Sequence, residues 1–450
     1  MKLKSLILGA AGMFAVTGAQ AADLPPAPEP VDYVRVCDAF GSGFFYIPGT
    51  DSCLRLRGRL RTEARYRSEK SNSIYDALPT PAGVRRLSVV GASAGRRNTS
   101  PFFMRARGYW GWDHRTNTDI GLVRAFFRGY IDRDTQDSNG TSLNLDFAFI
   151  QIGGLTVGYS DLIIEPVYLS YTLIHNWSVP GMDEETVLAQ YVYSFGNGFS
   201  VGAVIFDPTA GSFGSNPRSN FLAGSGAAGT EYGGVRMPNV GGALTYDGSI
   251  GTFRLSGFVQ DVRPNNPAGP ALIGSDHDIG WGVGFSGDIG VPLGTNTRIG
   301  FNSQYADGAI SFVNADLPSY GADFSVNGVG STTTTRAWSV GAGLTTQVAE
   351  RLTFNLGGGY TRASNSNVTG LAGFGIGQTG LDFTNSGTAS PWRSVAIIDA
   401  SANLQYRMTS NLVITGEASY RDVNINSTNG TTRIKGNSAF STILRAQLDF

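Results

Sequence analysis

The chain has 450 residues, a formal net charge of -1, and 11% aromatic but only 15% charged residues. A nearly neutral net charge implies no nucleic-acid partner, and we expect none. Soluble domains average about 25% charged residues, and the lower share here favours a protein that faces lipid.

The first 21 residues have the composition of a secretory signal. Lys2 and Lys4 precede a short apolar run, and the Ala-Gln-Ala at 19–21 supplies the small residues of a cleavage site. The apolar run is shorter than the roughly 20 residues that a membrane helix needs. We therefore expect residues 1–21 to be removed and the mature chain to be exported.

A proline-rich linker opens the next segment, 22–53, which we expect to lie on the periplasmic side. This segment holds the two cysteines of the chain, Cys37 and Cys53. An exported protein meets an oxidising compartment, so we expect the two thiols to form a disulfide. Neither cysteine lies near a histidine cluster of the kind that binds metal.

From residue 54 onward, apolar and polar residues alternate in short segments, which is the period of a β-strand. Leu352, Phe354 and Leu356, for example, alternate with Thr353 and Asn355. Such strands suit a membrane barrel, in which lipid-facing and lumen-facing residues alternate. We expect sixteen strands, at 54–67, 101–115, 118–132, 142–152, 155–160, 185–195, 199–207, 236–246, 250–260, 277–289, 297–306, 336–348, 351–362, 392–408, 411–422 and 439–450.

The connections between these segments alternate in length. Tight turns such as 196–198 and 247–248 alternate with long connections such as 208–235 and 307–335. Outer-membrane barrels have short periplasmic turns and longer outer loops. The sequence therefore predicts an all-β fold: a transmembrane antiparallel β-barrel over 54–450 with a water-filled interior.

The first expected strand carries a row of arginines on one face. An arginine that faces lipid at the midplane of a barrel costs about 2–4 kcal/mol, so the row must face the lumen. The next two strands add further arginines, and antiparallel pairing predicts that Arg59, Arg61, Arg105, Arg107 and Arg124 lie at similar heights. The expected basic residues of the pore lining are Arg55, Arg57, Arg59, Arg61, Arg105, Arg107, Arg124 and Arg128. The alternative is that these arginines only solvate a water-filled wall.

The long connection at about 161–183 is aromatic and apolar, unlike the others. A loop of that composition would not remain in water, so we expect it to fold into the barrel and narrow the channel. Its carboxylates would then face the basic wall, and charged constrictions are how pores select solutes. These acidic residues are Asp161, Glu165, Asp183 and Glu184. The alternative is a loop packed into a subunit interface.

The sequence carries no recognisable catalytic motif. None of the three histidines lies near a nucleophile elbow or near a second histidine at metal spacing. Glu184 and Glu185 are adjacent, so on a strand their side chains point apart. We expect neither enzymatic activity nor a bound cofactor or metal.

The last expected strand ends on an aromatic residue. Phe450 continues the apolar face that includes Leu444 and Leu448. A terminal aromatic in register with that face gives the insertion machinery a recognisable edge strand. We therefore expect Phe450 to act in assembly.

The stretch from Val31 to Arg59, VDYVRVCDAFGSGFFYIPGTDSCLRLRGR, resembles the opening of the alphaproteobacterial porins, porin family 2. The likeness is carried by Val-Cys-Asp-Ala-aromatic-Gly, Phe-Tyr-Ile-Pro-Gly-Thr and Cys-Leu-Arg, with Ala-Ala-Asp-Leu-Pro before them and an aromatic at the chain end. The resemblance implies a homotrimeric, sixteen-stranded porin in the lipid of a Gram-negative outer membrane, through which small hydrophilic solutes and ions diffuse passively. It also implies that the two cysteines of the family are Cys37 and Cys53.

Two other functions are consistent with a barrel. A substrate-specific nutrient channel would favour a ladder of lumenal aromatic residues, whereas the lumenal face in this sequence is rich in arginine. A barrel adhesin or receptor would carry its function in the outer loops.

Overall fold

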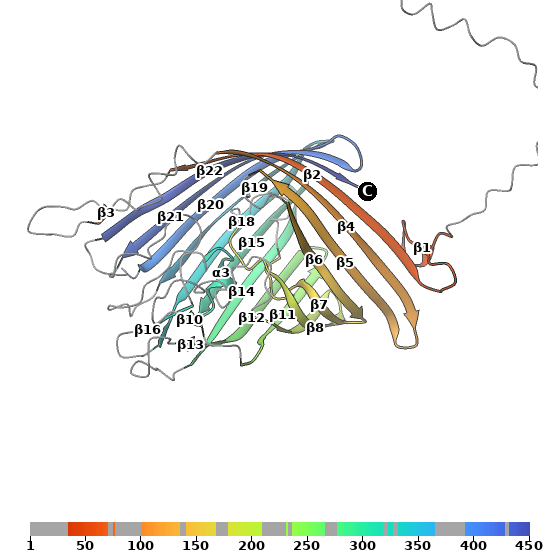
Figure 1. Cartoon of the computed structure of the whole chain (residues 1–450), viewed down its shortest axis with the longest axis horizontal. Helices are drawn as coiled ribbons and strands as arrows, with labels where there is room; N and C mark the ends of the chain where they lie inside the picture. Colours follow the sequence, from red (N-terminus) through yellow and green to blue (C-terminus); the bar gives the residue numbers. More distant parts are fainter. Residues whose placement is uncertain are drawn as a thin grey trace, which may run out of the picture.

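The chain folds into a closed barrel of antiparallel strands (Figure 1). The structure is a computed structural model and describes residues 35–70, 75–76, 101–135, 141–167, 179–208, 231–232, 236–265, 277–317, 323–326, 332–364, 392–427 and 432–450. The expected signal at 1–21 and the linker after it lie outside these residues. Within the described ranges, no helix has the length and apolar character needed to cross a membrane.

Sixteen of the described strands form the barrel wall. They are β2 (Cys53–Lys70), β4 (Phe102–Thr118), β5 (Gly121–Asp134), β6 (Thr141–Ile152), β7 (Leu155–Asp161), β8 (Glu185–Gly196), β9 (Phe199–Phe206), β11 (Asn239–Gly248), β12 (Gly251–Val262), β14 (Asp278–Val291), β15 (Thr295–Asp307), β18 (Arg336–Ala349), β19 (Leu352–Ser364), β20 (Trp392–Arg407), β21 (Leu412–Ser427) and β22 (Thr432–Asp449). Each strand pairs antiparallel with the next along the chain, and β22 pairs with β2 to close the barrel. The expected fold and strand number are confirmed, although β21 and β22 extend several residues further toward the connection between them than the sequence predicted.

The described residues also form short elements that are not among the sixteen wall strands. They are the 3-10 helix η1 (Asp38–Phe40), the strands β1 (Phe45–Tyr46), β3 (Tyr75–Asp76), β10 (Glu231–Tyr232), β13 (Pro264–Asn265), β16 (Phe324–Val326) and β17 (Thr332–Thr334), and the helix α3 (Ile310–Val313). β1 pairs with β2 and β3 pairs with β22, so both belong to the same sheet as the wall strands. The pairs β10–β13 and β16–β17 form separate two-stranded sheets.

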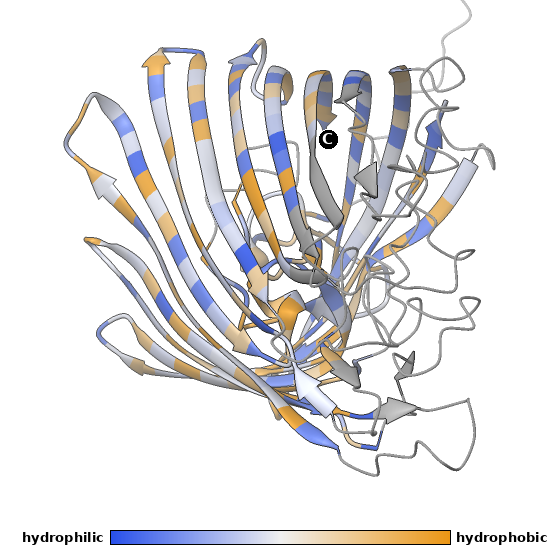
Figure 2. Ribbon diagram, turned by 90° about the vertical axis from the view of Figure 1, so that its left-hand side faces the viewer, coloured by the Kyte–Doolittle hydropathy of each residue, from blue (hydrophilic) through white to orange (hydrophobic). Residues whose placement is uncertain are grey.

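The two faces of the wall follow the alternation in the sequence. On β14, Ile279, Trp281 and Phe285 are 61%, 42% and 46% exposed on the outer face, while Ser286 and Asp288 are buried on the inner face. Figure 2 shows the same alternation as stripes of hydrophobic and hydrophilic residues along the strands. The barrel therefore presents an apolar exterior and a polar interior, as a membrane barrel requires.

Two connections pack inside the barrel. The described ends of the first, 162–167 and 179–184, contact the opposite wall: the Val167 N–H donates to the Ser286 hydroxyl of β14 at 2.8 Å. The second runs from β15 through α3, and the Gln304 side-chain amide of β15 donates to the carbonyl oxygen of Phe312 at 2.8 Å. The two segments meet where the Ala315 N–H donates to the Gly181 carbonyl at 3.0 Å. The sequence predicted an outer loop at 307–335. For residues 308–317 that prediction is wrong, because they pack inside the barrel.

Glycines on the lumenal face make room for these inner segments. A Cβ added to Gly282 of β14 would lie 2.6 Å from the Phe312 ring, and one added to Gly341 of β18 would lie 2.6 Å from Cγ1 of Val179. Side chains do not approach that closely, so a larger residue would push the segment away from the wall. The main buried apolar cluster of the described residues accordingly lies inside the barrel, between wall and inner segments.

A disulfide fixes the segment before the first wall strand. Cys37 and Cys53 are bonded across a sequence separation of 16, which confirms the expected bridge. Both are buried with Phe44, and the Arg115 guanidinium of β4 lies 4.8 Å from the Phe44 ring centre. Closing a loop of this size contributes about 3 kcal/mol in the chain-entropy model. The segment is thereby held against the start of β2.

The barrel closes at Gly58 of β2 and Phe450. The Phe450 N–H donates to the Gly58 carbonyl at 3.0 Å, and the Gly58 N–H donates to the Phe450 carbonyl at 2.7 Å. The Phe450 ring covers the place that a Gly58 side chain would take. Closure therefore joins the terminal aromatic residue to a position without a side chain.

We expect Gly58→Val to reduce the amount of inserted barrel severalfold, because valine would displace the Phe450 ring. Deletion of Phe450 should have the same effect, and neither change should alter the conductance of the channels that do insert. Heat-modifiable migration of the outer-membrane fraction measures the inserted amount. Gly108→Val is the matched control, because a Cβ there would make only an ordinary contact, 3.6 Å from Leu60. Normal insertion of both the Gly58 variant and the deletion would contradict a role of this contact in assembly.

Candidate functional site

The lumenal face of β2, β4 and β5, here called the basic wall, carries the arginines singled out in the sequence. Along β2, Arg57, Arg59 and Arg61 alternate with Leu56 and Leu60, which are exposed on the outer face. The side chains of the arginines therefore face the interior. The ion-pair and hydrogen-bond partners of these arginines determine how much uncompensated positive charge each one adds to the lumen.

A buried carboxylate binds three arginines, two of the basic wall and one of β22. The Glu63 side chain is 0% exposed and accepts ion pairs from Arg105 at 2.8 Å and from Arg445 at 2.6 Å. The Arg65 Nε donates to the same carboxylate at 2.7 Å. Because Glu63 and Arg65 come from β2, Arg105 from β4 and Arg445 from β22, this cluster joins three adjacent strands where the barrel closes.

The central arginines of the wall are also bonded. Arg107 pairs with Asp132 of β5 at 2.7 Å. Arg61 donates to the Gln447 side chain at 2.7 Å and to the Tyr109 hydroxyl at 3.0 Å. Guanidinium groups with such partners are held in fixed positions along the lumen.

Asp113 anchors the end of the basic wall near the tight turn between β4 and β5. It is fully buried and accepts two hydrogen bonds from Arg115, at 3.1 and 2.9 Å, and two from Arg124, at 2.9 and 3.1 Å. In the same part of the wall, Arg59 pairs with Asp449 of β22. Each of these carboxylates therefore offsets part of the positive charge of the basic wall.

The strand register corrects the heights expected for the arginines. Arg61 lies directly across from Arg107, as the sequence predicted. Arg124, however, pairs with Arg115, far along β4 from Arg107 and close to the tight turn. Arg124 therefore does not share the level of Arg61 and Arg107.

Arg55 and Arg57 differ from the rest of the wall. In the described part of the chain, neither forms an ion pair or a side-chain hydrogen bond, and Arg57 is exposed. The Asp113 carboxylate attracts the Arg57 guanidinium, but it already binds Arg115 and Arg124. Uncompensated positive charge is thus concentrated at these two residues.

Aromatic rings on β5 and β6 share the lumenal face with the arginines. The rings of Phe126 and Phe149 stack with centroids 5.3 Å apart, and Phe147 meets Phe126 edge-on at 6.0 Å. A β-bulge opposite Arg128 brings Asp146 and Phe147 to the same arginine: Asp146 forms an ion pair with it, and its guanidinium lies 4.4 Å from the Phe147 ring centre. These lumenal rings were not predicted from the sequence, although positions 124, 126 and 128 share one face of the strand and could have indicated Phe126.

The acidic residues of the first inner segment lie at its two ends. Glu165 is 9% exposed, and its Oε1 accepts the N–H groups of Leu162 at 3.3 Å and Glu184 at 3.1 Å. Burial, with the nearby charges of Asp161 and Asp183, raises the pKa of Glu165 well above its usual range. Burial likewise raises the pKa of Glu184 to about 7. These two carboxyls therefore carry less negative charge near neutral pH than the sequence suggests.

A raised carboxyl pKa gives the packing of the first inner segment a pH dependence. Because burial favours the protonated form of Glu165, the packed segment is most stable below the usual carboxyl pKa and loses stability as the pH rises through the raised value. We expect amides 162–167 to exchange hydrogen at least roughly tenfold faster at pH 8 than at pH 5 after correction for intrinsic rates, since one pKa unit corresponds to a factor of ten. Glu165→Gln should remove most of this difference.

The matched control for that measurement is Glu350→Gln, which changes an exposed carboxyl in a tight turn. It should exchange like the unmodified chain at both pH values. An unchanged pH dependence in the Glu165 variant would show that another group controls the packing.

The chain resembles known proteins in both sequence and fold. A family model described as "Porin subfamily" matches residues 22–443. The putative outer membrane protein y4fJ of Sinorhizobium fredii is 36% identical over 163 residues, which cover 35% of this chain and 43% of that protein. Porin Omp2b of Brucella suis is 32% identical over 270 residues, which cover 56% of this chain and 65% of that porin. The matched regions thus span less than two thirds of each of these relatives.

Among solved structures, the outer membrane channel DcaP of Acinetobacter baumannii resembles the chain with a TM-score of 0.60 and 16% identity. The match covers 90% of this chain and 99% of that one. At this level of identity the likeness concerns the fold.

Proposed function

The chain belongs to the porin subfamily, and on that premise we propose that it forms a water-filled channel for passive diffusion of small hydrophilic solutes and ions across the outer membrane. The observation that carries the proposal is the closed sixteen-stranded wall with an apolar exterior and a charged interior. A barrel of this size is wide enough to leave an aqueous channel. No catalytic role is proposed.

The channel is narrowed, in this proposal, from the side opposite the basic wall. The support is the set of contacts that hold the inner segments to the far strands: Arg254 of β12 donates to the Glu165 carbonyl at 2.8 Å, and Asn302 of β15 donates to the Pro180 carbonyl. The aromatic centre of the expected constriction, 168–178, lies outside the described residues. Solutes would then pass between the inner segments and the arginines.

A substrate-specific channel is the second candidate. The observation that favours it is the presence of lumenal rings at Phe126, Phe147 and Phe149, since a selective channel favours lumenal aromatic residues. An adhesin or receptor would use the outer connections, and most of their residues lie outside the described part of the chain.

A homotrimer in the lipid of the outer membrane is proposed for the assembly. The support is the family and the presence of two short wall strands, β7 and β9, close together in the barrel. Gel migration before and after heating tests it. A species of monomer size in mild detergent without heating would count against the trimer.

Single-channel recording in planar bilayers tests the channel itself. We expect discrete conductance steps in KCl from the folded protein and none from the same protein after heat denaturation. A folded barrel that inserts into the bilayer without conducting ions would refute the proposed function.

A further inference from the structure

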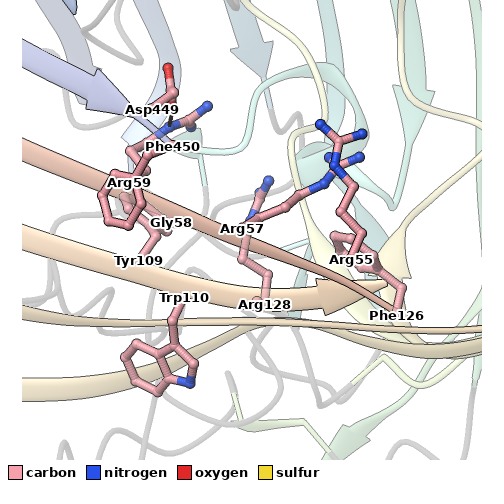
Figure 3. A pocket seen from close by; sticks show the side chains of 11 residues that line it. Arg55, Arg57, Gly58, Arg59, Tyr109, Trp110, Phe126, Arg128, Asp449 and Phe450 are labelled. Carbon is pink, nitrogen blue, oxygen red and sulfur yellow. Dashed lines mark hydrogen bonds and ion pairs between the residues drawn. The ribbon is translucent and has the colours of Figure 1, made fainter. Parts of the chain in front are cut away.

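A cleft in the barrel wall combines free positive charge with aromatic surface (Figure 3). Its volume is about 350 Å³. Its lining also includes Gly58 and Gly111, together with Trp110 and Phe450, whose side chains are exposed on the outer face. On the lumenal side it is lined by Arg55, Arg57, Arg59, Tyr109, Phe126 and Arg128.

The charge of the cleft is unevenly compensated. Arg59 pairs with Asp449, which also lines the cleft. Arg55 and Arg57 have no ion pair in the described residues, and Figure 3 draws their guanidinium ends on the side of the strands away from Trp110. A planar guanidinium without a partner is suited to a carboxylate, which it can bind through two parallel hydrogen bonds.

The aromatic surface of the cleft is held in place by its neighbours. Phe126 stacks on Phe149, with ring centroids 5.3 Å apart, and Tyr109 packs on Tyr130 at 5.1 Å. The Tyr109 hydroxyl also accepts a hydrogen bond from Arg107 at 3.2 Å. Fixed rings offer a further ring apolar contact and an offset or edge-on geometry at little cost in ordering.

We propose that this cleft binds small anions that carry an aromatic ring, with the carboxylate on Arg55 and Arg57 and the ring against Phe126. The inference rests on the proposed channel function and names a class of solute for it. A chloride ion or acetate would gain only the charge interaction, and a neutral ring only the apolar contact. The volume lies at the lower end of the range for ligand sites, which fits a ligand with a single ring.

Benzoate is the probe. Acetate, which keeps the carboxylate, and benzamide, which keeps the aromatic ring without the charge, are its matched controls. Single-channel current in KCl is recorded while each compound is titrated. We expect benzoate to reduce the current in a saturable way and to bind at least roughly tenfold more tightly than acetate or benzamide, since each lacks one of the two contacts. Equal effects of benzoate and acetate would overturn the role of the ring.

Two variants locate the site. Arg57→Gln and Phe126→Leu should each weaken benzoate binding roughly tenfold, the size expected when a charge-assisted bond or an aromatic contact is lost. Arg407→Gln is the control, because it removes a basic group at the end of β20, outside the cleft. If the Arg407 and Arg57 variants weaken benzoate equally, the effect comes from general lumenal charge and the cleft is not a site.

Calorimetric titration of the folded protein in detergent separates this inference from the channel function. Benzoate binding without KCl conductance would refute the channel and leave the cleft in place. Conductance without a preference for benzoate would refute the cleft alone. Should Phe126→Leu fail to fold, the comparison of benzoate with acetate on the unmodified protein still decides.

Discussion

Replacing Arg59, Arg61 and Arg107 together by serine is expected to move the ion preference of the channel strongly toward cations. Each substitution removes one positive charge, and Asp449 and Asp132, the partners of Arg59 and Arg107, are left as net negative groups. Charges on a narrow, low-dielectric wall act strongly on passing ions. We expect the ratio of cation to anion permeability to rise severalfold at 0.1 M KCl and roughly tenfold at 0.01 M, where the Debye length grows from about 10 to about 30 Å.

Reversal potential in a KCl gradient measures this change. The control replaces Arg336 and Arg351 by serine, since both lie at the rims of the barrel, where Arg336 is 69% exposed. That variant should keep the original selectivity. If the lumenal variant leaves selectivity unmoved at low salt while remaining folded, the basic wall does not border the ion path.

Of the substitutions considered, Glu63→Gln is expected to lower the free energy of unfolding of the barrel most. The carboxylate is the common partner of Arg65, Arg105 and Arg445, whose side chains are only 18%, 14% and 13% exposed. An amide would leave three guanidinium groups close together without a counter-charge. Removing one partner of a buried ion pair costs about 3–5 kcal/mol.

Urea unfolding of the barrel in detergent measures that loss as a lower midpoint. The matched control is Glu350→Gln, which exchanges the same groups in an exposed turn. An unchanged midpoint for the Glu63 variant would mean that lumenal water solvates the three arginines well enough to replace the carboxylate.

The fold could be predicted because alternation is a local property of the sequence. Ile279, Trp281 and Phe285 face outward and Ser286 faces inward, as their positions indicate. A wall strand carries apolar residues on its lipid side and polar residues on its inner side, so its pattern is readable without knowing its neighbours. The strand number followed from the same local evidence, whereas the disulfide was expected from the oxidising compartment that an exported chain meets.

The arrangement of the site depended on contacts that alternation does not encode. Arg124 was placed at the wrong level because its height is set by pairing with Arg115, and register is fixed by both strands and the turn. Phe147 lies beside Arg128 because of a bulge at Asp146, which shifts the alternation by one residue. Sequence patterns of single strands cannot show either effect.

The second inner segment was missed for a related reason. Its apolar residues Ile310 and Phe312 occur within a long connection and look like part of an outer loop. The burial of Phe312 depends on Gly282, which lies on a strand outside that connection. Only the assembled wall shows that the two fit.

Glycines on the inner face of the wall also determine how this barrel can be re-engineered. Phe312 and Val179 occupy space that exists only because Gly282 and Gly341 leave it open. A transplant of the second inner segment into another barrel would need the equivalent of Gly282, and a transplant of the first would need the equivalent of Gly341. Deleting an inner segment to widen the barrel interior would leave the wall glycines uncovered, and bulkier residues would be needed there. An inner segment and the wall that it packs on can therefore be exchanged only together.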